Sequence, residues 1–154
     1  GNRGAGGARR GGARPRNVQL FVRDDGLALL GGRDAKGNIA ARKLAAAHDI
    51  WLHTDGGPGS HVIIRRAHAG QEVPERTLDQ AGALAACKSW QKDAARARIL
   101  YAEVRHIRSM RGAGTGTVRM DKILYSREVP VDASLETRLL PESPAGKTDG
   151  TGRD

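Results

Sequence analysis

Two short strand-like segments, separated by the loop "DGGPGS", constrain the fold of this chain most strongly. The segments are "DIWLHT" (49–54) and "HVIIRR" (61–66), and alternate side chains of a strand face opposite sides of its sheet. One face carries four aliphatic residues suited to a core: Ile50, Leu52, Val62 and Ile64. The other carries an aromatic and cationic set: Trp51, His53, His61 and Arg65. The pattern predicts either an exposed patch of this second set or a second packed layer that covers Trp51 and Ile63.

Two further segments have the composition and spacing of helices. Residues 36–48 are rich in alanine, and Asn38 is their predicted N-cap. Residues 74–98 form the longer predicted helix, with Thr77 as N-cap and apolar residues at helical spacing. This helix holds Cys87, the one cysteine of the chain, which excludes an internal disulfide and is expected to be a small buried side chain.

The remaining apolar segments alternate in the manner of strands. Residues 17–32 predict a β-hairpin that turns at Asp25-Gly26, a dipeptide that favours positive φ. Residues 99–107 predict a strand, followed by a loop over 108–117 and one or two closing strands within 118–131. The chain is therefore expected to be a single α+β domain over residues 17–132, with a largely antiparallel mixed sheet and two main helices.

Both ends of the chain lack the apolar residues needed to build a core. Residues 1–16 are expected to be a flexible basic linker, and residues 133–154 a disordered C-terminal tail. The first residue is Gly rather than Met, which favours a piece of a longer protein over a free-standing one. No apolar run is long enough to span a membrane, so we expect a cytoplasmic protein.

The positive charge of the chain is concentrated in two blocks. The formal net charge is +9 over 154 residues, which makes a polyanion the natural partner. Residues 1–16 contain five arginines and no acid, whereas residues 96–127 contain eight basic residues against Glu103 and Asp121. The low aromatic content of 3% argues against base-by-base stacking of a single strand and favours a protein that reads the shape and phosphates of folded RNA.

The residues around the glycine-rich loop are compatible with three alternative functions. A metal site would use His53 and His61 with Asp49 or Asp55, but no recognised ligand spacing is present. A nuclease would use the same two histidines as an acid and base pair. A binding surface would bring phosphate close to the loop glycines and offer Trp51 as a stacking face.

Four segments together resemble a known family, the NFACT-R domain of the NEMF, RqcH and fibronectin-binding-protein-A-like proteins. They are "GRDAKGN" (32–38), "HDIWLHTDGGPGSHVII" (48–64), "PERTLDQAGALAACKS" (74–89) and "VRHIRSMRGAGTGTV" (104–118). The sequence departs from the family pattern at Ile39, where an acidic residue is common, and in the late loop, where "GTG" replaces a lysine-rich "KPG".

The resemblance implies a module that binds rRNA or tRNA on the large ribosomal subunit, without catalytic residues or cofactor. Such a module would form the C-terminal part of a ribosome-associated quality-control factor that acts on stalled subunits bearing peptidyl-tRNA. A free-standing domain that presents tRNA to 4-thiouridine-forming enzymes is the alternative, and a histidine-dependent RNase is a further one. No metal, membrane or small-molecule substrate is expected.

We assign the RNA-binding site from these motifs and from the charge distribution. The structured part is expected to comprise Trp51, His53, Ser60 and His61. Phosphate contacts are expected from Arg65, Arg105, Arg108 and Arg111. Gly59 would permit the turn, and Asp49 would orient His53 or an adjacent backbone group.

Overall fold

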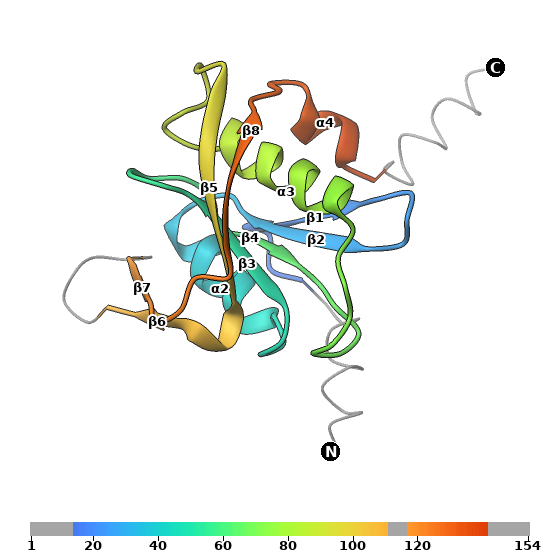
Figure 1. Cartoon of the computed structure of the whole chain (residues 1–154), viewed down its shortest axis with the longest axis vertical. Coiled ribbons are helices and arrows are strands. Elements are labelled where there is room, and N and C mark those ends of the chain that lie inside the picture. Colours follow the sequence, from blue (N-terminus) through green and yellow to red (C-terminus); the bar gives the residue numbers. More distant parts are fainter. Residues whose placement is uncertain (1–13, 111–116, 142–154) are drawn as a thin grey trace.

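The computed structural model describes residues 14–110 and 117–141 and has the predicted α+β architecture (Figure 1). The strands are β1 (Val18–Val22), β2 (Ala28–Gly32), β3 (Ile50–Thr54), β4 (Val62–Ile64), β5 (Arg96–Glu103), β6 (Ile107–Ser109), β7 (Val118–Met120) and β8 (Tyr125–Pro130). The helices are α2 (Ala35–Leu44), α3 (Glu75–Cys87) and α4 (Leu135–Leu139), with a 3-10 turn at Val104–His106. Six strands form one antiparallel sheet in the order β1-β2-β4-β3-β5-β8, and β6 and β7 form a separate hairpin.

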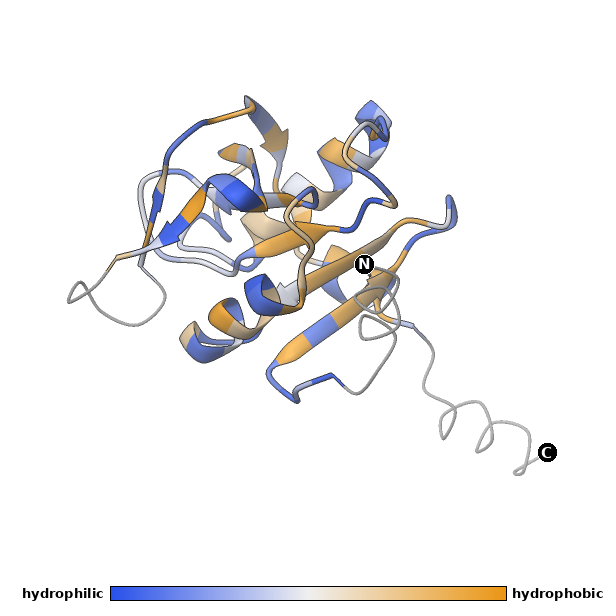
Figure 2. Ribbon diagram, turned by 90° about the horizontal axis from the view of Figure 1, so that it is seen from below, coloured by the Kyte–Doolittle hydropathy of each residue, from blue (hydrophilic) through white to orange (hydrophobic). Residues whose placement is uncertain are grey.

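The sheet is packed on both faces, as Figures 1 and 2 show. Helix α3 covers one face, where the aliphatic set of β3 and β4 joins Leu78 and Leu84 in the larger core cluster. Helix α2 covers part of the other face, where Trp51 and Ile63 pack with Ala41 in a second cluster. The hydrophobic residues accordingly concentrate in the strands (Figure 2).

The second packed layer decides between the two interpretations of β3 and β4. The Trp51 side chain is 1% exposed and His61 is 3% exposed, so an exposed aromatic patch is the wrong interpretation for these two residues. The assignment of side chains to faces is correct, because Ile50 pairs with Ile64 and Trp51 pairs with Ile63 in the antiparallel register. Burial follows because α2 packs over this face, which a strand pattern by itself does not reveal.

Both predicted helix caps are wrong, although both helices exist. Helix α2 begins after Asp34, whose carboxylate accepts a hydrogen bond of 2.7 Å from the N–H of Gly37. Helix α3 begins after Pro74, and the Thr77 hydroxyl instead donates to Asp25 at 2.7 Å, which ties the helix to the β1–β2 turn. That turn lies where the sequence predicts it, with Gly26 at a φ of +85°.

The longer helix ends at Cys87, eleven residues before its predicted end at residue 98. Beyond it the backbone pairs with the glycine-rich loop: the N–H of Trp90 donates to the Pro58 carbonyl at 2.9 Å, and the N–H of Ser60 donates to the Lys88 carbonyl at 3.1 Å. These long-range bonds replace the helical ones. Strand β5 can then begin at Arg96.

Two elements differ from expectation in the C-terminal half. The predicted strand over 99–107 is broken by the 3-10 turn, whereas the closing segment supplies β7 and β8, in agreement with the one or two strands predicted there. Helix α4 lies in the segment assigned to the tail, yet its Leu135 and Leu139 are 2% and 8% exposed and belong to the larger core cluster. The folded domain therefore extends beyond residue 132. Within residues 14–110 and 117–141, none of the helices is long and apolar enough to cross a bilayer.

Candidate nucleic-acid interface

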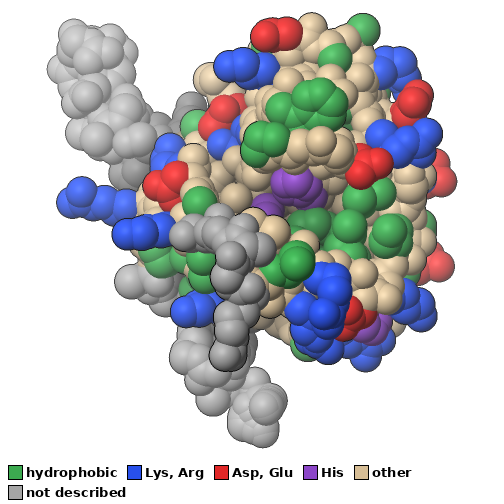
Figure 3. All heavy atoms as spheres, turned by 90° about the vertical axis from the view of Figure 1, so that its left-hand side faces the viewer, with side chains coloured by type: hydrophobic (Ala, Val, Ile, Leu, Met, Phe, Trp, Pro, Cys, Tyr) green, Lys and Arg blue, Asp and Glu red, His purple; other side chains and the backbone are tan. Residues whose placement is uncertain are grey.

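An open cavity of about 660 Å³ lies on the α2 side of the sheet. Its walls come from the start of α2, from β3 and from β7, and the glycine-rich loop closes one end. Figure 3 shows this region as a hollow with histidine at its centre and hydrophobic and basic side chains around it. Four of the residues predicted to contact RNA line the cavity, although they are separated by up to ten positions in the sequence: Trp51, His53, Ser60 and His61.

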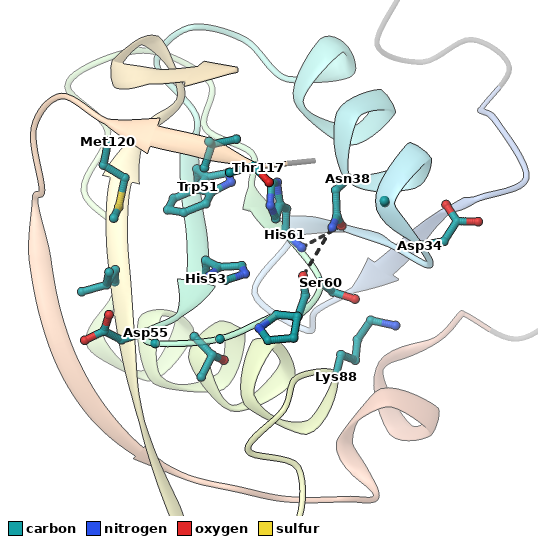
Figure 4. Close-up of a pocket in the computed structure, with 18 of the residues that line it drawn as sticks. Asp34, Asn38, Trp51, His53, Asp55, Ser60, His61, Lys88, Thr117 and Met120 are labelled. Carbon is teal, nitrogen blue, oxygen red and sulfur yellow. Dashed lines mark hydrogen bonds between the residues drawn. The ribbon is translucent and has the colours of Figure 1, made fainter. Parts of the chain in front are cut away.

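Three rings form a continuous aromatic wall in the cavity (Figure 4). The Trp51 and His53 rings are stacked, with centroids 5.7 Å apart and an interplanar angle of 11°. The His61 ring meets both edge-on, with centroid distances of 5.3 Å. The rings lie together because positions 51 and 53 share one face of β3, and His61 immediately precedes β4 on the same face.

Burial keeps both imidazoles neutral at physiological pH. The pKa of His61 is lowered to about 3, mainly by loss of solvation and to a smaller extent by the neighbouring His53 and Arg42. Loss of solvation also lowers the pKa of His53 from its usual value, against the opposing effects of backbone hydrogen bonds. The wall is therefore an uncharged aromatic surface rather than a cationic one.

The low pKa of His61 predicts a loss of stability in mild acid. The unfolded chain binds a proton at His61 near pH 6.5, whereas the folded chain does not bind it until about pH 3. Stability from this group is thus full above pH 6.5 and declines as the pH falls below it. Between pH 7 and pH 5, urea denaturation of the parent chain should show a loss about 2 kcal/mol larger than that of the His61→Phe variant. Equal losses in the two proteins would contradict this account.

The glycine-rich loop owes its shape to Gly56 and to close contacts of its other glycines. Gly56 has a φ of +90°, a backbone conformation that favours glycine. A Cβ at Gly59 would lie 2.7 Å from the Cβ of Ser89, and one at Gly57 would lie 2.5 Å from the Trp90 ring. The Asp55 N–H is used within the fold, donating to the Arg98 carbonyl at 2.9 Å.

Asn38 is a site residue that the sequence misassigned to a helix cap. Its Oδ1 accepts from the N–H of His61 at 2.9 Å and its Nδ2 donates to the Gly59 carbonyl at 3.3 Å. The Ser60 hydroxyl donates to the Gly32 carbonyl at 2.6 Å. These bonds fix the end of the loop against α2 and β2 (Figure 4), so the Ser60 hydroxyl proton is not available to a ligand in this arrangement.

Asp49 orients backbone groups, which is one of the two roles predicted for it. Its carboxylate is fully buried and accepts from the N–H of Ala46 at 2.9 Å and from the N–H of Arg66 at 2.7 Å. The first bond fixes the turn that leads into β3, and the second fixes the chain just beyond β4. Asp49 thereby holds together the two strands that carry the aromatic wall.

Two of the predicted phosphate-binding arginines lie at the β6–β7 hairpin, whose strand β7 lines the cavity: Arg108 is in β6 and Arg105 is in the 3-10 turn before it. Arg105 pairs with Glu103 at 2.8 Å, and Glu103 also pairs with Arg66 at 2.8 Å. Arg108 pairs with Asp121 at 3.1 Å, and the Asp121 carboxylate also pairs with Arg119 at 2.9 Å. In each cluster two guanidinium groups share one carboxylate, which leaves one positive charge unbalanced.

The other two predicted arginines do not join this arrangement. Arg65 is half-buried near the opposite end of β4 from His61 and does not line the cavity. Arg111 lies outside the described residues. Two cations that the sequence analysis missed, Arg33 and Lys88, do line the cavity. Lys88 is bound to Glu136 at 2.9 Å and to Gln19 at 2.7 Å, so this contact links the cavity to α4.

No metal site accompanies the two histidines in the described part of the chain. There, no three His, Cys, Asp or Glu side chains lie close enough together to hold an ion. The arrangement is instead suited to flat, neutral groups in the cavity and to anionic groups on the arginine clusters beside it.

Comparison with known proteins identifies the sequence as one of a family. Residues 17–122 match the family model described as the NFACT protein RNA binding domain. The chain is 35% identical over 105 residues to the Rqc2 homolog RqcH of Bacillus subtilis, a match that covers 68% of this chain and 18% of the relative. It is 36% identical over 73 residues to ribosome quality control complex subunit 2 of Schizosaccharomyces pombe, covering 46% of this chain and 7% of the relative.

Further matches agree with these two. The human ribosome quality control complex subunit NEMF is 32% identical over 75 residues, covering 48% of this chain and 7% of that protein. The chain thus spans less than a fifth of the length of these relatives. A solved structure, the C-terminal part of the fibronectin/fibrinogen-binding protein from Streptococcus suis, has the same fold, with a TM-score of 0.74 and 19% identity over 84% of this chain and 51% of that one.

Proposed function

The chain belongs to the family of NFACT protein RNA binding domains, and on that premise we propose that it binds rRNA or tRNA of the large ribosomal subunit. Its relatives carry the names of ribosome quality control proteins. We accordingly propose that the domain serves, in the cytoplasm, as the RNA-binding part of a factor that acts on stalled subunits bearing peptidyl-tRNA.

One observation supports this proposal most strongly: the β6–β7 hairpin that carries Arg108 and Arg119 also lines the cavity, through Thr117, Val118 and Met120. Arg105 and Arg108 are 58% and 53% exposed at their side chains, so both can reach a phosphate without a change of fold. Because each cluster has one more guanidinium than carboxylate, an approaching phosphate completes the pairing instead of displacing an acid. Guanidinium groups suit this contact because they bind phosphate oxygens in pairs.

The same geometry favours binding of RNA without cleavage. A phosphodiester-cleaving pair needs one imidazole as the base and one imidazolium as the acid. Burial lowers the pKa of both His53 and His61, so neither supplies the protonated partner near pH 7.

The test is equilibrium binding of the purified chain to deacylated tRNA, to fragments of large-subunit rRNA and to duplex DNA of matched length. We expect one RNA to bind best, with an affinity that falls about tenfold between 50 and 200 mM salt, as about two to three phosphate contacts require. The RNA should remain intact on a gel. Equal affinity for the DNA, or cleavage that is lost in His53→Ala, would contradict the proposal.

A further inference from the structure

The aromatic wall of the cavity is larger and more apolar than phosphate binding requires. Besides Trp51, His53 and His61, the cavity is lined by Leu100 and by Met120. An aliphatic chain and a thioether pack well against the faces of flat rings. A volume of about 660 Å³ lies within the range of sites that enclose a small organic group, about 300 to 1,000 Å³.

Two ring nitrogens of this wall lack a hydrogen-bond partner among the described residues: Trp51 Nε1 and His61 Nδ1. Both side chains are more than nine-tenths buried. Buried polar atoms are nearly always paired in folded proteins, so two unpaired ones beside one cavity indicate a ligand with polar atoms at its edge. Nucleobases combine such polar edges with flat apolar faces.

We propose that the cavity accepts one unpaired base of the bound RNA, while the phosphates on either side of that base meet the arginine clusters. This proposal rests on the proposed RNA-binding function and adds the kind of RNA feature that is recognised. A single base pocket also agrees with the low aromatic content, because one stacked base needs only the rings that are gathered here.

The experiment compares two oligomers with equal numbers of phosphates: a single-stranded RNA of five nucleotides and the matching abasic ribose-phosphate chain. We expect the RNA to bind about tenfold more tightly, the effect of stacking about one base. In Leu100→Trp, which fills the cavity from β5, the two oligomers should bind equally. Met120→Trp fills it from β7 and gives a second test, should the first variant not fold.

Two results would overturn the base pocket and leave RNA binding intact. The first is equal, salt-dependent binding of both oligomers by the parent chain. The second is a tenfold preference that survives in a folded Leu100→Trp or Met120→Trp variant. Binding of tRNA but of neither oligomer would also exclude the pocket, whereas failure to bind any RNA would overturn the proposed function itself.

Discussion

Replacing Asp49 with alanine should lower the free energy of unfolding by about 3 to 5 kcal/mol. The Asp49 carboxylate is fully buried and accepts two backbone hydrogen bonds, at 2.9 Å from Ala46 and at 2.7 Å from Arg66. A hydrogen bond to a charged group contributes about 1.5 to 3 kcal/mol, and truncation leaves both N–H groups without this acceptor. Urea denaturation at pH 7 measures the change.

Asp24→Ala is the matched control for this variant. Asp24 is also an aspartate, and it pairs with Arg76 at 2.8 Å, but both side chains are largely exposed. Exposed ion pairs contribute little, so the loss should stay within about 0.5 kcal/mol. If Asp49→Ala were as stable as Asp24→Ala, Asp49 could not be the residue that holds β3 and β4 together.

Reversing the charge of the two arginine clusters should have the largest effect on RNA affinity. The double variant Arg105→Glu/Arg108→Glu places a carboxylate where each proposed phosphate contact lies. We expect affinity for the preferred RNA to fall about 100-fold near 100 mM salt, and the salt dependence to become correspondingly weaker. Fluorescence anisotropy with labelled RNA would measure both.

The control for this double variant changes the same number of charges on α3 and α4. Arg76 and Arg138 are exposed to similar extents, and each pairs with a carboxylate, Asp24 and Asp132 respectively. Arg76→Glu/Arg138→Glu should change RNA affinity less than threefold at the same salt concentration, because α3 covers the opposite face of the sheet. A similar loss in both double variants would mean that net charge alone drives binding.

The sequence predicts the fold well where the signal is local. The hairpin around Gly26 and the alternating faces of β3 and β4 both follow from residue spacing, and the structure confirms them. The positions where helices begin are harder to predict from sequence. Asp34, Asn38 and Thr77 are all residue types suited to N-caps, and tertiary contacts determine which of them caps a helix. The early end of α3 depends on backbone bonds to a loop about thirty residues away, at Pro58 and Ser60.

In the candidate site, too, features that depend on local sequence are predicted and features that depend on tertiary packing are not. Strand alternation places Trp51, His53 and His61 on one face and the loop motif adds Ser60, and all four line one cavity. Their burial could not be predicted, because it depends on where α2 packs. Lys88 and Met120 reach the cavity from elements distant in sequence, so no local pattern marks them. Leu135 and Leu139 are four residues apart in a polar segment, a spacing that is compatible with a helix but too short to establish one.

The most direct test of the central claim is to locate bound RNA on the surface of the domain. Ultraviolet cross-linking of the preferred RNA, followed by mass spectrometry of the peptides, identifies the contacting residues. We predict cross-links in residues 51–61 and in residues 117–120, which line the cavity on the α2 side of the sheet. Cross-links confined to residues 75–87, on the helix that covers the opposite face, would contradict the account.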